Sequence, residues 1–377
     1  MQTCNKKDRI IVSNMENRIT VRDYDDDGVL NNVEHWSMDE IVDGYLDQLN
    51  LKYPSEGMRM VEENESLLLE FVSHLIRGHT SRFPFCTVNH VLHNHHQPSS
   101  VLSQMSTWAL YQRICLQRRG GYCFEHNKLV FDILKHMGFQ VQLVLARIVH
   151  NDLSILNGTK ERPPLTHRLT LFRLNSKSYI IDCAFGGEKG PIRPVPLPSI
   201  LPTITTDDYD STVGGSIIVD ELHRSFRIGY NPDLPDSYSL QCCHPTLTRD
   251  EFFTLYIFTL FPYSENDCTL GHFYSHNHPN AIFTKNLLVG SINLDNKTDT
   301  DQNISRYEIH SLWNLSYRRY TNIDTNNAKM ITTVISSPDE LHSILVKKCG
   351  LTGITERNCE NIFTHLKENE IKMHKES

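Results

Sequence analysis

The sequence lacks any apolar run long enough to cross a membrane. Its longest apolar and aromatic stretch, Phe252 to Pro262, includes threonines and is far shorter than the roughly 20 residues that a membrane-spanning helix requires. The first residues include two lysines but no apolar segment typical of a signal peptide. We therefore expect a cytoplasmic protein with no membrane partner.

The chain also lacks an excess of basic residues. Its 37 lysines and arginines against 45 aspartates and glutamates give a formal net charge of -8 at pH 7. A protein that binds nucleic acid needs a basic face to neutralise phosphates. Nucleic acid is therefore not an expected partner.

Cysteine pairing and zinc-binding spacing are missing as well. The ten cysteines are scattered, so without an export signal we expect free thiols in a reducing compartment. A chain of 377 residues buries enough apolar surface to fold without disulfides or a structural metal. Seven histidines lie in two stretches that are rich in Asn, Ser and Pro and contain no cysteine at zinc-finger spacing, which favours polar loops over zinc sites: His90, His93, His95, His96, His272, His276 and His278.

One acidic segment fits the calcium loop of an EF hand by position. Asp23, Asp25 and Asp27 stand at positions one, three and five, with Gly28 at position six and Glu34 at position twelve. The residues before it are β-branched, where an EF hand needs a helix, and the chain has no second loop of this kind. A calcium loop and a solvated acidic turn both remain open, and we expect that no metal is required.

The hydrophobic periodicity changes along the chain. Residues 1–37 form a polar extension, whereas residues 38–138 carry apolar side chains at helical spacing. Apolar residues then alternate as in strands over residues 139–245, and residues 246–377 mix both patterns. We therefore predict an α+β fold in which a helical domain, a β domain and a mixed domain follow one another.

The segment from Arg118 to Asn127 carries a candidate nucleophile. Gly120 and Gly121 allow a tight turn, and Cys123 then falls in the first turn of a predicted helix. The unpaired N–H groups there and the positive end of the helix dipole favour a thiolate and could also stabilise an oxyanion. A lone cysteine is usually an inert core residue, so this prediction needs partners.

A predicted β-hairpin supplies those partners. If Asn175-Ser176 forms a two-residue turn, Asp182 lies opposite Leu169, and His167 lies diagonal to Asp182 on the same face. Diagonal neighbours are roughly 7–8 Å apart, within reach of an imidazole and a carboxylate, whereas a three-residue turn would place them on opposite faces. Because a carboxylate in an apolar strand needs a partner, we predict a Cys-His-Asp triad of Cys123, His167 and Asp182.

These motifs resemble the arylamine N-acetyltransferase family. The resemblance is strongest in the cysteine motif from Arg119 to Asn127, in the Thr166-His167 pair that leads a strand, and in Tyr179 to Gly187, which contains the aspartate. It covers about residues 38–360 and weakens outside 110–195. Phe85 is followed by Cys86, where the family usually has Glu in a segment that borders the acceptor pocket, so the resemblance leaves the choice of acceptor open.

The resemblance implies a helical bundle (38–138), a central antiparallel β-barrel (139–245) and a C-terminal α/β lid (246–377) around a cysteine-protease-like Cys-His-Asp core. It also implies acetyl-CoA as co-substrate and a small aromatic amine or hydrazine as acceptor. The reaction would be ping-pong through acetyl-Cys123, with His167 as general base and acid and Asp182 orienting it. A monomer or homodimer is expected.

The resemblance also suggests a set of residues that contact acetyl-CoA: Arg119, Gly121, Thr166, Gly186, Gly187 and Ser275. An arginine beside the cysteine could instead form a buried ion pair, and the two glycines after the aspartate could simply end the strand. Two other functions remain open. The same triad serves thioester and amide hydrolases such as transglutaminases and cysteine proteases, and a non-catalytic relative could bind CoA through this scaffold.

Overall fold

The computed structural model divides the chain into two compact units, Met1–Tyr53 and Pro54–Ser377. It describes residues 10–13, 19–24, 30–53, 65–93, 105–186, 189–198, 215–230, 237–244, 251–294, 307–321 and 329–376.

The first unit contains a three-stranded antiparallel sheet and one helix. Ser37 caps the helix, because its hydroxyl accepts a hydrogen bond from the backbone N–H of Glu40 at 3.2 Å while the Glu40 carboxylate accepts one from the Ser37 N–H at 2.7 Å. This is a capping box. The elements are β1 (Ile10–Ser13), β2 (Ile19–Tyr24), β3 (Leu30–His35) and α1 (Met38–Gln48).

The predicted calcium loop falls in this small sheet. Asp23 lies in β2 opposite Asn31 of β3, and Glu34 lies in β3, while Asp25 and Asp27 are outside the described residues. An EF hand flanks its loop with two helices, whereas strands flank the segment here. Calcium binding stays a prediction, and the flanking strands do not fit EF-hand geometry.

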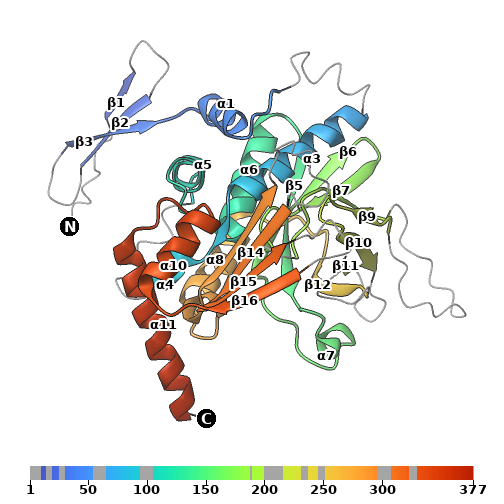
Figure 1. Ribbon diagram of the computed structural model, residues 1–377. Coiled ribbons are helices and arrows are strands. Elements are labelled where there is room, and N and C mark those ends of the chain that lie inside the picture. Colours follow the sequence, from blue (N-terminus) through green and yellow to red (C-terminus); the bar gives the residue numbers. More distant parts are fainter. Residues whose placement is uncertain are drawn as a thin grey trace, which may run out of the picture. The chain divides into compact units, whose positions relative to one another are not determined.

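The second unit begins with helices and also ends with them (Figure 1). Two of its helices continue into single π-helical stretches, η2 and η3. The helical elements are α3 (Glu65–Arg82), α4 (Val88–His93), α5 (Thr107–Tyr111), η2 (Gln112–Leu116), α6 (Cys123–His136), α7 (Leu153–Leu156), α8 (Glu265–Asn277), α9 (Ile282–Lys285), α10 (Pro338–Ser343), η3 (Ile344–Lys348) and α11 (Glu356–Glu376).

The central part of this unit is an eight-stranded antiparallel sheet that curls into a nearly closed barrel. The strands lie in the order β8-β7-β6-β5-β12-β11-β10-β9, and β8 at one end contacts β10 near the other. Buried aliphatic and aromatic side chains of β5, β6, β10, β11 and β12 fill its interior. The strands are β5 (Gln140–Ile148), β6 (His167–Leu174), β7 (Lys177–Ile181), β8 (Val195–Pro196), β9 (Ile218–Val219), β10 (Ser225–Tyr230), β11 (Tyr238–Cys243) and β12 (Phe253–Phe258).

A second antiparallel sheet lies in the C-terminal part, with strand order β16-β15-β14-β13-β4. One buried cluster joins this sheet to α4, α10, η3 and α11, which lie side by side in Figure 1. The predicted α+β fold class with a helical part, an antiparallel barrel and a C-terminal part is thus confirmed. The strands are β4 (Phe85–Cys86), β13 (Leu288–Leu294), β14 (Tyr307–Trp313), β15 (Ser316–Thr321) and β16 (Lys329–Val334).

Two strands cross the predicted domain boundaries. β12 follows residue 245 but joins the barrel, whereas β4 belongs to the sequence of the helical part but pairs with β13 of the C-terminal sheet. The division into four predicted segments therefore stays a prediction. Through these two strands, the barrel and the C-terminal sheet each contain a strand from another predicted segment.

The hairpin register predicted from the two-residue turn is confirmed. Leu174 of β6 pairs with Lys177 of β7, and Thr170 pairs with Ile181. Asp182 comes directly after β7, whereas His167 is the first residue of β6. The hairpin thus brings the imidazole and the carboxylate to one end of the barrel.

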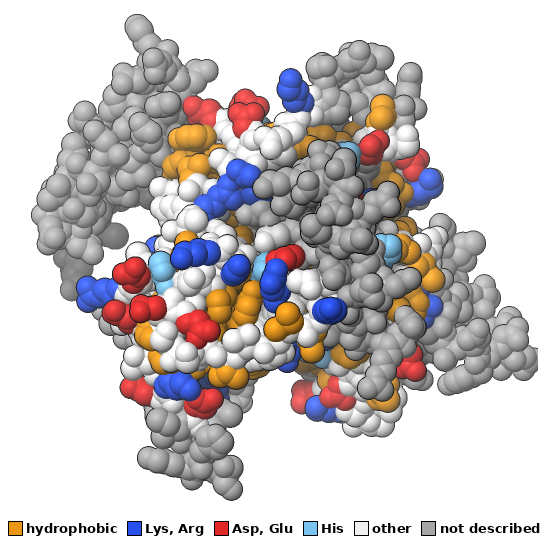
Figure 2. Space-filling view, in the orientation of Figure 1, with side chains coloured by type: hydrophobic (Ala, Val, Ile, Leu, Met, Phe, Trp, Pro, Cys, Tyr) orange, Lys and Arg blue, Asp and Glu red, His pale blue; other side chains and the backbone are white. Residues whose placement is uncertain are grey.

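On the face shown in Figure 2, basic and acidic side chains of the described residues are interspersed. None of the helices in the described ranges is both long and apolar enough to span a bilayer.

Gly120 brings the turn before α6 against β4. Its φ of +69° is in the left-handed region, and a Cβ built on it would lie 2.6 Å from Cys86 Cβ and 2.9 Å from the Pro84 carbonyl oxygen. The Cys86 N–H donates to the Gly121 carbonyl oxygen at 2.6 Å. The glycine pair therefore serves a close approach between two backbone segments, which fixes where α6 begins.

We expect Gly120→Ala to destabilise the protein more than Gly158→Ala, which provides a matched control. Both glycines have left-handed φ angles, +69° and +73°, but a Cβ at Gly158 meets no atom within 4 Å. Both substitutions add backbone strain, and only the first adds overpacking, which costs about 1–3 kcal/mol. Thermal unfolding of the two variants measures the difference; equal midpoints would contradict the role given to the close approach.

Candidate functional site

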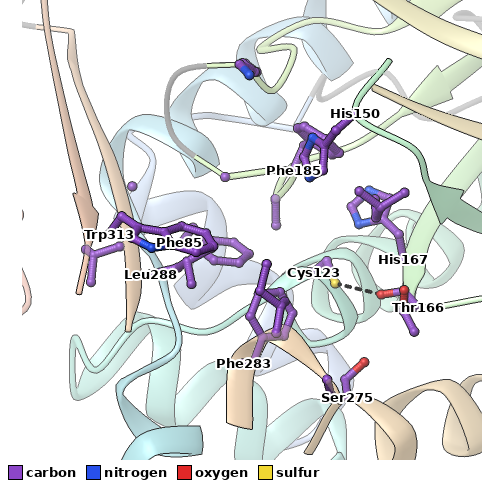
Figure 3. Close-up of a pocket in the computed structure, with 18 of the residues that line it drawn as sticks. Phe85, Cys123, His150, Thr166, His167, Phe185, Ser275, Phe283, Leu288 and Trp313 are labelled. Carbon is purple, nitrogen blue, oxygen red and sulfur yellow. Dashed lines mark hydrogen bonds between the residues drawn. The ribbon is translucent and has the colours of Figure 1, made fainter. Parts of the chain in front are cut away.

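Cys123 is the first residue of α6, as predicted, and its side chain is buried. Glu125 holds the start of the helix. Its carboxylate accepts a hydrogen bond from the Tyr122 N–H at 3.0 Å and forms an ion pair with the Arg113 guanidinium at 2.6 Å. The Cys123 thiol lies 3.6 Å from the Thr166 carbonyl oxygen, the contact drawn in Figure 3. The nucleophile candidate is therefore fixed beside the first residues of the hairpin.

His167 and Asp182 form a buried pair. His167 Nε2 lies 2.7 Å from Asp182 Oδ2, and both side chains are almost fully enclosed, with exposed side-chain fractions of 3% and 0%. Because Nε2 is used by the carboxylate, Nδ1 is the ring nitrogen left to face the thiol. The side chains of His167 and Asp182 thus lie on the same side of their sheet, as the register predicts.

Asn127 holds the carboxylate from the helix side. Its side-chain amide donates to Asp182 Oδ1 at 3.0 Å and to the Arg168 carbonyl oxygen at 2.6 Å, and its amide oxygen accepts from the Cys183 N–H at 2.9 Å. Asn127 had no predicted role. Its position four residues after Cys123 on one helix face is the pattern that could have revealed it.

The electrostatics of the pair favour an imidazolium and a carboxylate. Burial alone would lower the pKa of His167, but the charge and hydrogen bond of Asp182, with a contribution from Cys123, raise it to about 10. Burial raises the pKa of Asp182, but His167, Asn127 and the Ala184 N–H together hold it below the usual value. The arrangement can therefore keep a positive charge next to the Cys123 sulfur.

Cys123 and His167 open into a cavity of about 510 Å³, a volume ordinary for small-molecule sites. Figure 3 shows the thiol at its centre, with aromatic rings around it. These rings come from β4, the segment after β7, α9 and β14: Phe85, Phe185, Phe283 and Trp313. The cavity can hold a planar aromatic group against the thiol.

Three of the predicted cofactor contacts line this cavity: Thr166, Gly186 and Ser275. Gly187 lies outside the described residues. The roles of all four in binding a co-substrate stay predictions.

Arg119 and Gly121 make other contacts. The Arg119 guanidinium is 3.5 Å from Asn89 Oδ1, and a Cβ on Gly121 would lie 2.9 Å from the Glu125 carboxylate. Neither residue lines the cavity. A buried ion pair does lie near this motif, but Arg113 makes it with Glu125, and both belong to the helical part. Binding of the co-substrate by Arg119 and Gly121 stays a prediction.

The expectation of polar histidine loops was wrong for three residues. His90 lies in α4, His272 and His276 lie in α8, and all three are buried around Tyr122. A short hydrogen bond joins the Tyr122 hydroxyl to His272 Nδ1. Long-range packing of α8 onto α6 creates this cluster. Within the described ranges no group of three or more His, Cys, Asp or Glu side chains is placed to hold a metal ion.

His150 is a cavity residue that the sequence analysis did not identify. It follows β5, and its imidazole lines the same cavity as Cys123 and His167. No motif or spacing in the sequence marks it, because its position depends on a turn that β12 holds in place.

Comparison with known proteins gives a consistent result. A family model described as N-acetyltransferase matches residues 68–354. The chain is similar to the arylamine N-acetyltransferase of Mycobacterium tuberculosis (strain CDC 1551 / Oshkosh), with 28% identity over 229 residues, 60% of this chain and 69% of the relative. It is also similar to that of Escherichia coli (strain K12), with 29% identity over 188 residues, 49% of this chain and 56% of the relative.

Solved structures share the fold. The arylamine N-acetyltransferase from Mycobacterium abscessus matches with a TM-score of 0.65 and 19% identity, covering 89% of this chain and 99% of that one. The Mycobacterium marinum enzyme, solved in complex with CoA, matches with a TM-score of 0.61 and 20% identity, covering 86% of this chain and 98% of that one.

We expect the His167 ring of the wild-type protein to titrate near pH 10. In Asp182→Asn we expect the same ring to titrate at a far lower pH, because burial lowers its pKa and no carboxylate is left to raise it. Since the folded-state pKa lies above 6.5, the ion pair stabilises the fold below pH 6.5 and this stability is lost as the pH rises through about 10. Histidine side-chain NMR measures the midpoint, with His167→Gln identifying the signal. An unchanged midpoint in Asp182→Asn would contradict the assigned cause.

Proposed function

Because the chain belongs to the arylamine N-acetyltransferase family and is therefore an acyltransferase, we propose that it moves an acetyl group from acetyl-CoA to an aromatic amine or hydrazine by way of Cys123. The observation that carries the proposal is the buried His167–Asp182 pair beside the Cys123 thiol, at the base of an aromatic cavity. Nucleophile, base and orienting acceptor are all present within one site.

In the first half-reaction, the Cys123 thiolate attacks the thioester carbon of acetyl-CoA. We assign the stabilisation of the oxyanion to backbone N–H groups in the first turn of α6. As the bond from carbon to the CoA sulfur breaks, the leaving thiolate takes the proton of the His167 imidazolium. This leaves acetyl-Cys123 and a neutral imidazole, which Asp182 keeps in position.

In the second half-reaction, the acceptor nitrogen attacks the acetyl carbon. A nitrogen–carbon bond forms, the carbon–sulfur bond breaks, and the proton lost by the amine goes to His167. The thiolate and imidazolium are thereby restored, so the cycle closes without any other proton donor. Asp182 stabilises the imidazolium at each stage in which it forms.

The aromatic cavity supports transfer over hydrolysis. Transfer requires that an amine reach acetyl-Cys123 while water is held back. The rings of Phe85, Phe185 and Phe283 line the space in front of the thiol, and they can stack on an aromatic acceptor. A hydrolase with the same three residues would need an open path for water.

We expect one acetyl group to add to the protein on mixing with acetyl-CoA, and to leave when an arylamine is added. Cys123→Ala removes the nucleophile and should abolish the adduct. Cys243→Ala is the control, because Cys243 is a half-buried thiol on β11, away from the cavity. Intact-mass spectrometry reads the adduct, and chromatography reads the N-acetylated product.

The other outcomes separate the alternatives. Release of free acetate without acetylated amine would indicate a hydrolase. CoA binding without any adduct would indicate a non-catalytic relative. An adduct that persists in Cys123→Ala would refute Cys123 as the nucleophile.

A further inference from the structure

A second imidazole, that of His150, lines the same cavity as His167. His150 lies beyond the end of β5, and in Figure 3 its ring stands beside Phe185, on the same side of the cavity as His167. The centre of the Phe185 ring is 5.9 Å from that of His150 and 5.5 Å from that of His167. One phenylalanine ring therefore contacts both imidazoles.

The backbone that carries His150 is strained and tightly held. His150 has a φ of +45° and the next residue, Asn151, a φ of +61°. The N–H groups of His150 and Asn151 donate to the carbonyl oxygens of Leu255 (3.2 Å) and Thr254 (2.7 Å) in β12, and the Thr254 N–H donates to Asn151 Oδ1 at 3.1 Å. Left-handed residues other than glycine persist where their surroundings enforce them, and they concentrate at functional sites.

The ring of His150 is available to a ligand. The residue is exposed to the cavity, and among the described residues Phe185 is the one aromatic ring that its imidazole contacts. Neither ring nitrogen has a hydrogen-bond partner among those residues. A turn held by three hydrogen bonds to β12 thus presents an imidazole whose ring nitrogens are not used by any of the described residues.

Burial and, to a smaller extent, nearby positive charges favour the neutral form of this ring. Burial lowers the pKa of His150, and the positive charges of Lys189 and His167 lower it further. Arg318 of β15 also lines the cavity. In the free enzyme the two imidazoles of one cavity therefore favour opposite forms, because the pKa of His167 is raised and that of His150 is lowered.

We propose that His150 binds the acceptor, by accepting a hydrogen bond from one N–H of the amine that attacks acetyl-Cys123. A primary amine or hydrazine has two N–H bonds on the attacking nitrogen: one donates to His150, and the proton of the other passes to His167 as the new nitrogen–carbon bond forms and the carbon–sulfur bond breaks. The inference rests on the proposed acetyl transfer and names its acceptor class as primary amines and hydrazines.

The hydrogen bond strengthens during the reaction. The attacking nitrogen gains positive charge as it bonds to carbon, so its N–H becomes a better donor to a neutral imidazole. Loss of one hydrogen bond to a charged group corresponds to roughly a 10- to 100-fold loss of rate. An N-methylated amine has a single N–H on the attacking nitrogen, and the proton of this N–H passes to His167. Such an amine therefore has no N–H left to donate to His150, and His150 does not speed its reaction.

The test measures the discharge of preformed acetyl-enzyme, freed of acetyl-CoA, by aniline and by N-methylaniline. His150→Asn keeps a residue that tolerates left-handed φ, and His150→Phe keeps the ring contact with Phe185. We expect both to slow discharge by aniline about 10- to 100-fold and to leave discharge by N-methylaniline within about 3-fold of wild type. His223→Asn is the matched control, since His223 is an exposed histidine with a φ of +54° that does not line the cavity.

A pH profile distinguishes this role from a merely structural one. As the pH falls through the lowered pKa of His150, the ring gains a proton and can no longer accept a hydrogen bond. Discharge of wild-type acetyl-enzyme by aniline should therefore fall on the acid side, and this limb should be absent in His150→Asn. The titrations that wild type and His150→Asn share then belong to His167 and to protonation of aniline itself.

The outcomes separate this inference from the function on which it rests. If no acetyl-enzyme forms on wild-type protein, the proposed transfer itself fails, and the role of His150 fails with it. If acetyl-enzyme forms and both His150 variants discharge to aniline at the wild-type rate, only the role of His150 is refuted. Equal slowing with aniline and N-methylaniline would also refute it, because a structural defect would affect both amines alike.

Discussion

The buried pair of His167 and Asp182 is the interaction on which the site depends. Two charges so enclosed have lost most of their hydration, which is costly unless hydrogen bonds replace it. Asp182 receives three, from the His167 ring, the Asn127 amide and the Ala184 N–H. Because Asn127 belongs to α6 and the other donors to the barrel segments, the same network that solvates the charge also joins the nucleophile's helix to the hairpin.

The cavity, like the network around Asp182, is built from segments that are far apart in the sequence. Its aromatic lining comes from β4, from the segment after β7, from α9 and from β14, while α6 and β6 supply the reactive side chains. β4 is central to this arrangement, since it pairs with β13 and also bridges to Gly121 just before α6. The close approach at Gly120 thus fixes the cysteine with respect to the C-terminal sheet, so packing far from the thiol sets the shape of the space in front of it.

The sequence was informative wherever local chemistry decides the outcome. A two-residue turn at Asn175-Ser176 has a single register, and that register places His167 and Asp182 on one face. The cysteine motif likewise predicts a helix start, because glycines, capping and periodicity are local. His272, in contrast, was assigned to a polar loop although it is buried against Tyr122, since no local pattern shows which helix will cover it. β12 lies beyond the predicted end of the barrel, because its pairing with β5, far away in the sequence, leaves no periodic trace.

His150 shows how far the same limit extends into function. A histidine after a strand carries no recognisable pattern, and its importance comes from a left-handed backbone that β12 imposes and from cations placed by other segments. Burial lowers the pKa of His150, and Lys189 and the imidazolium of His167 lower it further. Asp182 has the opposite effect on His167, because its charge and hydrogen bond raise the pKa of that ring. Two imidazoles that line one cavity are thus given different protonation states by their separate surroundings, and these surroundings come from segments far apart in the chain.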